Sequence, residues 1–220
     1  MDGNYLDSAT LDNTKALEDQ IFYPPRRHLC PERTNTMFSL DRSGLFCIET
    51  SCNRNRRGAQ MKPCGIITLL TDFGLEDGYV GIVKGVILGI NPSARIVDIS
   101  HLIPHGSILD AALVLQEAWH FFPEGTVHLA IVDPGVGTSR IPLALETSNH
   151  CFVGPDNGLF RPIIDQYPSS KIVHLNKSQY FLPEISNTFH GRDIFAPVAA
   201  HLSSGIALHL LGSPVSDPVS

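Results

Sequence analysis

Features that would tie a chain to a membrane or to a nucleic acid are missing from this sequence. No apolar run approaches the roughly 20 residues that a helix needs to cross a bilayer, so we expect no membrane partner. Basic residues are also scarce: 16 Lys and Arg stand against 22 Asp and Glu, and the excess of acid falls in residues 61–220. Because a phosphate backbone is bound by a basic surface, we expect no nucleic-acid partner.

Cysteine pairs are missing as well. The five cysteines are odd in number and form no CxxC motif, which argues against a disulfide framework and a zinc knuckle. Cys30, Cys47 and Cys52 lie near His28, but their spacing fits no common set of metal ligands. We therefore expect no metal, and we interpret the cysteines as free thiols of a cytoplasmic protein.

The character of the chain changes near residue 61. Residues 51–60 are rich in Asn, Arg and Ser and have little apolar periodicity, whereas Met61 precedes a strongly apolar run. A length of 220 residues suits one well-buried domain. We interpret residues 1–60 as a mostly disordered N-terminal extension and expect the folded domain to begin at Met61.

From residue 65 onward, short β-branched runs alternate with longer amphipathic ones. This pattern predicts an α/β fold with a mostly parallel central sheet flanked by helices. Strands are predicted at residues 65–70, 95–100 and 126–132, and in the segments PLALET, CFVG and KIVHL. Helices are predicted after Asp77, between residues 108 and 122, and over residues 193–202, where Pro197 suits a first helical turn.

Polar residues follow the predicted strands at similar places. Asp72 in TDFG follows the first strand, and Asp133 in VDPGVGTSR follows the third, with Arg140 at the end of the same segment. His190 in FHGRD precedes a predicted helix. Because the carboxyl ends of parallel strands share one sheet edge, the TDFG and VDPGVG loops and the GPDNG loop after CFVG should converge on one crevice. A carboxylate, a guanidinium and an imidazole beside glycine-rich backbone indicate an enzyme that activates water without a metal.

Each of these residues also has a purely structural interpretation. Asp72 can cap its own turn, and an ion pair between Asp133 and Arg140 would be structural yet compatible with catalysis. His190 is one of ten histidines. The GPDNG segment is a strong turn signal, which favours a turn-forming role for Asn157 and its neighbour Asp156.

Six ordered segments resemble one known family: ITLLTDFG with DGYVG, DISH, HLAIVDPGVGTSR, FVGPDNGLF and TFHGRDIFAPVAAHL. They are similar to the S-adenosyl-L-methionine (SAM) hydrolases that form adenosine, also called SAM hydroxide adenosyltransferases, which are related to SAM-dependent chlorinases and fluorinases. The resemblance implies attack of activated water on the ribose 5′ carbon of SAM, releasing adenosine and L-methionine. It implies no cofactor, because SAM is the substrate.

The resemblance also implies roles for individual residues. Asp133, Arg140 and His190 match the catalytic set that prepares the water: Arg140 favours hydroxide, His190 receives or relays the proton, and Asp133 fixes the geometry. Asp72 matches the carboxylate that binds the ribose hydroxyls. The expected substrate-binding set is Asp72, Phe73, Asp133 and Asn157.

Family members usually carry a smaller β-rich C-terminal domain and form homotrimers. We expect residues 61–210 to be the catalytic domain and residues 211–220 to be a truncated linker, with the C-terminal domain and much of the adenine site absent. A homotrimer is then expected if that domain is supplied. Two alternatives stay open: a non-catalytic fragment or pseudoenzyme that binds adenosine or SAM, and a SAM-dependent halogenase.

Overall fold

The computed structural model describes residues 36–40, 46–50 and 61–219, which belong to two units. In the first unit, β1 (Thr36–Leu40) and β2 (Phe46–Thr50) pair antiparallel. Most of residues 1–60, which the sequence predicts to be disordered, lie outside the described ranges. No helix in the described ranges is long and apolar enough to cross a membrane.

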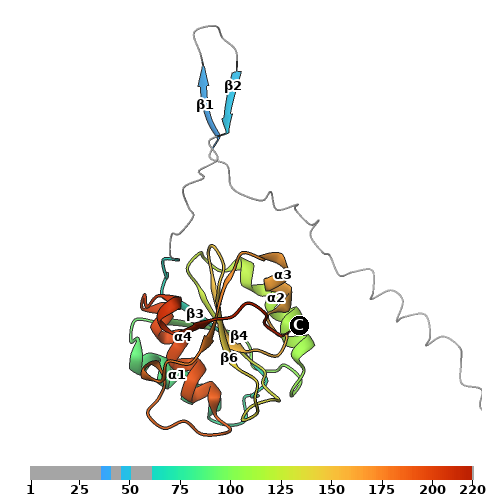
Figure 1. Cartoon of the computed structure of the whole chain (residues 1–220), viewed down its shortest axis with the longest axis vertical. Helices are drawn as coiled ribbons and strands as arrows, with labels where there is room; N and C mark the ends of the chain where they lie inside the picture. Colours follow the sequence, from blue (N-terminus) through green and yellow to red (C-terminus); the bar gives the residue numbers. More distant parts are fainter. Residues whose placement is uncertain (1–35, 41–45, 51–60, 220) are drawn as a thin grey trace, which may run out of the picture. The chain divides into compact units, whose positions relative to one another are not determined.

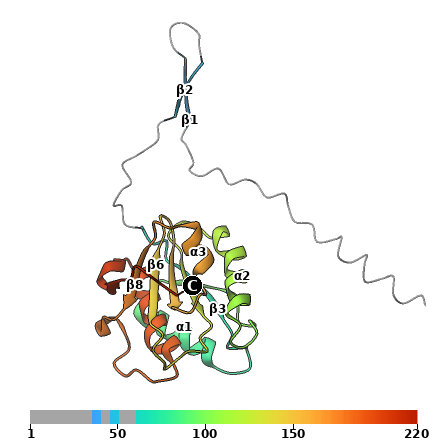
Figure 2. The ribbon, with the colours of Figure 1, turned by 45° about the vertical axis from the view of Figure 1, so that its right-hand side comes forward.

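The second unit is an α/β fold (Figures 1 and 2). Its strands are β3 (Ile66–Thr71), β4 (Arg95–Ser100), β5 (Val127–Ile131), β6 (Pro142–Glu146), β7 (Cys151–Pro155), β8 (Lys171–Leu175) and β9 (Gly212–Pro214). Its α-helices are α1 (Tyr79–Ile90), α2 (Ile108–Ala118), α3 (Arg161–Gln166) and α4 (Ala196–Ser203). Shorter helical turns are η3 (Trp119–Phe121), η4 (Ser178–Tyr180), the π-helical η5 (Gly191–Phe195) and η6 (Leu208–Leu210).

The seven strands form one mixed sheet in the order β4-β3-β5-β7-β6-β8-β9. The first four in this order are parallel, which confirms the predicted parallel core. The sheet is less parallel than predicted beyond β7, because β6, β8 and β9 pair antiparallel. Only residues 147–150 connect β6 to β7. A connection as short as this can join only antiparallel strands. β9 lies within the stretch that the sequence suggests is a linker.

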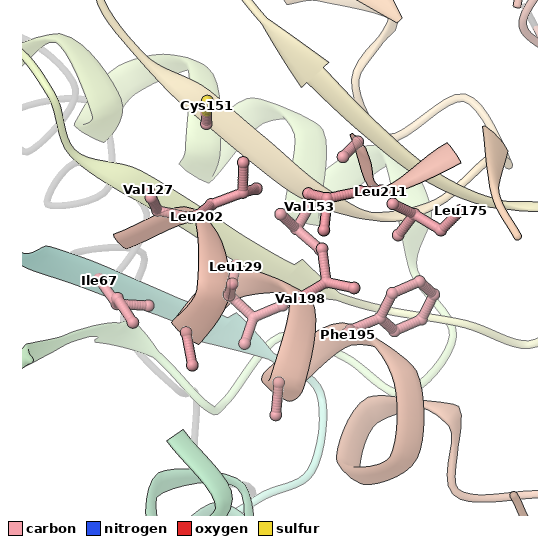
Figure 3. Close-up of a cluster of buried hydrophobic side chains, with 14 of the residues drawn as sticks. Ile67, Val127, Leu129, Cys151, Val153, Leu175, Phe195, Val198, Leu202 and Leu211 are labelled. Atoms are coloured by element: carbon pink, nitrogen blue, oxygen red, sulfur yellow. The ribbon is translucent and has the colours of Figure 1, made fainter. Parts of the chain in front are cut away.

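Two apolar layers hold helices against the two faces of the sheet. On one face, Val83 and Ile87 of α1 and Val198 of α4 pack with Ile67 and Leu129 of the sheet. Figure 3 shows Ile67, Leu129 and Val198 in this layer. On the other face, α2, η3 and α3 pack through residues that include Leu115, Trp119 and Ile163 respectively. Full burial of one such aliphatic side chain contributes about 1.5–3 kcal/mol to the free energy of folding. The apolar contacts therefore hold helices on both faces of the sheet.

Helix α1 begins close to its predicted start. Val80, Val83 and Ile87 are buried, as their spacing predicts. Gly78 occupies the N-cap position, and Asp77 acts from one residue earlier, where its Oδ1 accepts a hydrogen bond of 2.9 Å from the Tyr79 amide.

The parallel core decides where the polar loops lie. β3, β4, β5 and β7 run in one direction, so the residues that follow them line the same sheet edge. These are Asp72 after β3, His101 after β4, Asp133 after β5 and Asp156 with Asn157 after β7.

Candidate active site

Asp133 and Arg140 form an ion pair within the loop that follows β5. Arg140 Nε donates to both Asp133 carboxylate oxygens, at 2.8 and 3.0 Å, and Arg140 Nη2 also donates to Oδ2. The two side chains are only 9% and 7% exposed. A two-pronged contact of this kind fixes the plane of the guanidinium as well as its charge.

The same guanidinium also holds His190. Arg140 Nη2 lies 3.0 Å from His190 Nδ1. Because a guanidinium can only donate, Nδ1 is the acceptor, and a neutral imidazole then carries its proton on Nε2. Burial, followed by the charge of Arg140, lowers the pKa of His190, against the opposite effect of Asp133 and Asp193. The three predicted catalytic side chains therefore meet in space.

One arm of Arg140 is left without a protein partner. Arg140 Nη1 is buried and makes no hydrogen bond to the described residues. The guanidinium carbon lies 5.2 Å from the centre of the Phe195 ring, which supports the group from the core side. A buried donor without an acceptor is costly, so this atom is suited to bind an oxygen of a ligand or of water.

Glycines bring the neighbouring loops close to this cluster. Gly137 has a φ of +77°, and a Cβ there would lie 2.7 Å from the carbonyl oxygen of Asn187, in the segment that precedes His190. Both the backbone conformation and the close approach therefore require glycine at this position.

Asp72 and Phe73 lie beside the cluster. Asp72 Oδ2 accepts a 2.8 Å hydrogen bond from the Gly106 amide and lies 3.3 Å from His105 Nδ1. A Cβ at Gly106 would touch Pro134 at 3.7 Å, next to Asp133, and a Cβ at Gly191 would lie 3.3 Å from the Phe73 ring. Gly106, which donates to Asp72, thus lies next to the loop of Asp133, and Phe73 of the TDFG turn lies next to the residue that follows His190.

Asn157 does not contact the cluster directly. Its Nδ2 donates to the Val132 carbonyl oxygen at 2.8 Å, and its Oδ1 accepts from the Leu159 amide at 3.3 Å. This matches the turn-forming interpretation, and it also supports the backbone just before Asp133. Asn157 further lines a shallow hollow of about 540 Å³ between α2 and α3.

Two hollows of the second unit are not lined by Asp133, Arg140 or His190. Besides the one beside Asn157, a hollow of about 470 Å³ lies between β8 and the segment of residues 207–215. Neither is lined by Asp72, Asp133, Arg140 or His190. Among the described residues, no group of three or more His, Cys, Asp or Glu side chains is placed to hold a metal ion.

Sequence reasoning missed two groups of residues at this edge. Tyr79 stacks on Phe189 with ring centres 5.0 Å apart, which ties α1 to the segment of His190. Asp193 is fully buried; it accepts from the Ser186 amide at 2.8 Å and from Arg192 Nε at 2.6 Å. A signal was available for Asp193, because a carboxylate inside an apolar helical run needs a partner.

Comparison with known proteins finds a family and individual proteins that this chain resembles. Residues 67–212 match the N-terminal domain of the SAM hydroxide adenosyltransferases. The chain is 42% identical over 158 residues to a (R)-S-adenosyl-L-methionine hydrolase of Salinispora tropica, covering 71% of this chain and 58% of that protein. It is 26% identical over 175 residues to a fluorinase of an Actinoplanes species, covering 69% of this chain and 59% of the fluorinase.

A solved structure has a similar fold. The crystal structure of an uncharacterized conserved protein from Thermotoga maritima matches with a TM-score of 0.68 and 43% identity, covering 70% of this chain and 60% of that one. The chain thus spans less than two thirds of the length of these relatives. The matched range, the fold and the ordered motifs agree, and the chain belongs to the SAM hydroxide adenosyltransferase family through that family's N-terminal domain.

Proposed function

We propose that the protein hydrolyses S-adenosyl-L-methionine to adenosine and L-methionine, with residues 61–210 as the catalytic domain. The observation that carries this proposal is the contact of Asp133, Arg140 and His190 beside Asp72 at one sheet edge. The relative from Salinispora tropica named as a hydrolase of this substrate supports it.

The reaction makes limited demands on the protein. The water oxygen forms a bond to the 5′ carbon while the bond from that carbon to sulfur breaks. The electron pair stays on sulfur, which becomes the thioether of methionine, and the water loses one proton. Because the leaving group departs neutral, no general acid is needed, and the site must orient the water and favour its hydroxide form.

Arg140 is suited to that second task. Its unpartnered, buried Nη1 can donate to the water oxygen, and its charge stabilises hydroxide over water. Asp133 fixes the guanidinium through its two oxygens.

His190 has a narrower role than simple proton acceptance. Its Nδ1 already accepts from Arg140, so the ring can take up a proton there only after that bond opens. A charged ring would also face the guanidinium, which is one reason why its pKa is lowered. We propose that neutral His190 orients the water by donating from Nε2. The proton that the water loses can reach the ring only at Nδ1, once the hydrogen bond from Arg140 has opened, and it then leaves to solvent.

Asp72 and Phe73 form the proposed ribose side of the site. The Asp72 carboxylate is held in place by the Gly106 amide and can accept from both ribose hydroxyls. Phe73 packs on Gly191 and supplies an apolar wall. For Asn157 we propose a supporting contribution to substrate binding, through its hydrogen bond to Val132.

The halogenase alternative is supported by the more distant similarity to a fluorinase. A halide must lose its water to react, and a site that favours hydroxide works against that. The cluster of Arg140 and His190 therefore favours hydrolysis.

The test is chromatography of the products formed from SAM by purified residues 1–220, with and without fluoride or chloride. We expect adenosine and methionine in equal amounts. Formation of a 5′-halo-adenosine would support the halogenase instead. Binding of adenosine in calorimetry without any turnover would support the non-catalytic binding module. A cytoplasmic location belongs to the same proposal, as does a homotrimer if the C-terminal domain is supplied. Light scattering of the purified protein, with and without that domain, tests the assembly.

A further inference from the structure

The DISH segment has no role in the mechanism above, yet it lies against the turn that carries Asp72. His101 follows β4 and is 5% exposed. It contacts the turn at two points: its Nδ1 lies 2.9 Å from Thr71 Oγ1, and its carbonyl oxygen accepts from the Gly74 amide at 2.8 Å. These two contacts enclose Asp72 and Phe73.

Thr71 extends this contact into the turn. Its hydroxyl oxygen accepts a 3.3 Å hydrogen bond from the Phe73 amide. The hydroxyl is therefore linked to His101 on one side and to the backbone after Asp72 on the other. Thr71 is 1% exposed, so water does not replace these partners readily.

Asp98 holds the other side of the imidazole. Its Oδ1 lies 3.2 Å from His101 Nε2, an electrostatic contact too poorly aligned for a hydrogen bond, and its Oδ2 accepts from Lys84 Nζ at 2.6 Å. Because a carboxylate can only accept, a neutral imidazole is best placed with its proton on Nε2. Nδ1 then accepts from the Thr71 hydroxyl, whose oxygen stays free for the Phe73 amide.

An irregularity of the sheet brings these groups together. The register of β3 and β4 shifts between Leu69 and Leu70, so that Leu69 pairs with Asp98 and Leu70 with Ser100. The extra residue in β4 turns the following side chains relative to the sheet. Such bulges are frequent beside active sites, where they redirect a side chain.

We propose that His101 is a positioning residue for substrate binding: with Thr71 and Asp98 it fixes the turn that presents the Asp72 carboxylate to the ribose hydroxyls. This inference rests on the proposed hydrolysis of SAM. A carboxylate that contacts the ribose in ground state and transition state alike affects KM more than kcat. Loosening the turn that carries Asp72 should likewise raise KM more than it lowers kcat.

The test compares two matched threonines on β3. Thr68 is also buried, and its hydroxyl lies 2.9 Å from a histidine nitrogen, Nδ1 of His128, but it has no contact with the Asp72 turn. Thr71→Val and Thr68→Val each remove one such hydroxyl. Thr71→Ser keeps it. All are assayed on the full chain, with thermal unfolding recorded for each variant.

We expect Thr71→Val to raise KM for SAM by about tenfold, the equivalent of losing one buried hydrogen bond, with kcat changed less. Thr71→Ser should restore KM, and Thr68→Val should lower the unfolding temperature without changing KM. Equal KM values for the two valine variants would overturn the inference. If the wild type binds SAM without turnover, calorimetric Kd values replace KM in the same comparison. If it neither binds nor turns over SAM, the proposed function fails, and this inference with it.

Discussion

Arg140 contacts both other members of the proposed catalytic cluster, Asp133 and His190. It donates to Asp133 and to His190 and keeps one buried donor unpaired. Replacement by alanine should lower kcat for adenosine release about 10²- to 10³-fold, as expected for the loss of a donor that stabilises developing charge. Arg140→Lys keeps the charge but loses the planar fork, so it should recover only part of the rate.

The matched control for this prediction is Arg161→Ala, which removes an exposed pairing with Asp165 on α3. It should leave kcat unchanged, since exposed pairs of this kind contribute little. If Arg140→Ala had the kcat of the control, Arg140 would have no part in the chemistry.

The ionisation of His190 predicts the acid side of the pH profile. Its pKa is lowered from 6.5 by burial and by Arg140, so the neutral form persists below that pH. We expect kcat/KM to hold through neutral pH and to fall with a midpoint below 6.5 as the ring gains a proton. The same limb should disappear in His190→Asn. A midpoint above 6.5 would contradict the geometry.

The members of this cluster could be identified from sequence, whereas their hydrogen bonds could not. Asp133, Arg140 and His190 stood out because they follow strands or precede a helix, and the resemblance assigned them roles. The acceptance of an Arg140 hydrogen bond by His190 Nδ1 depends on the orientations of two side chains 50 residues apart, which no spacing encodes.

At the scale of elements, β5 and β7 determine where Asp133 and Asn157 lie. Gly154 of β7 has no room for a side chain, because a Cβ there would overlap the Ala130 carbonyl oxygen of β5 and lie 3.0 Å from the Phe160 ring. Gly154→Ala should lower the free energy of unfolding by about 1–3 kcal/mol, as overpacking does, and should also reduce activity by separating the strands.

A glycine in open space is the control. A Cβ at Gly89, inside α1, would meet nothing within 4 Å. Gly89→Ala should therefore raise the free energy of unfolding, by about 0.5–1 kcal/mol. Urea unfolding of both variants measures the contrast, and a stabilising Gly154→Ala would contradict the packing described for β7.

The elements that could be predicted best from the sequence were those with a clear periodicity of apolar residues. β3, β5 and α1 begin within about two residues of their predicted starts, consistent with the usual precision of boundaries. The reversed direction of β6 and β9 was not predicted, because an apolar strand has the same pattern in either direction. The π-helical turn Gly191–Phe195 begins before the helix predicted over residues 193–202 and overlaps its first three residues, where the spacing predicts an ordinary helix.

At the scale of the whole molecule, two buried histidines make stability depend on pH. His128 Nε2 lies 3.1 Å from His150 Nδ1, and the Trp119 ring packs edge-on against both. Burial lowers the pKa of His128 well below 6.5, and lowers that of His150 to about 4. Unfolding restores ordinary values, so between pH 6.5 and about 4 the unfolded chain binds protons that the folded protein excludes.

The contribution is therefore complete above pH 6.5 and is lost as the pH falls toward 4. We expect the free energy of unfolding, measured in urea at several pH values, to decrease over this window. His150→Gln should flatten the dependence, whereas replacing the exposed His209 by Gln should not. An unfolding free energy that stays constant down to pH 4 would show that the pair is not protected from protons.

Phe195 belongs to the apolar layer under α4 (Figure 3). Its ring also lies beneath the Arg140 guanidinium. A smaller side chain there would leave a void and would also remove the support of the guanidinium that we propose orients the reacting water. Selection for heat tolerance and selection for turnover consequently act on the same ring. In a library that varies the interior of this domain, active clones should retain phenylalanine at 195 even where the surrounding aliphatic residues drift.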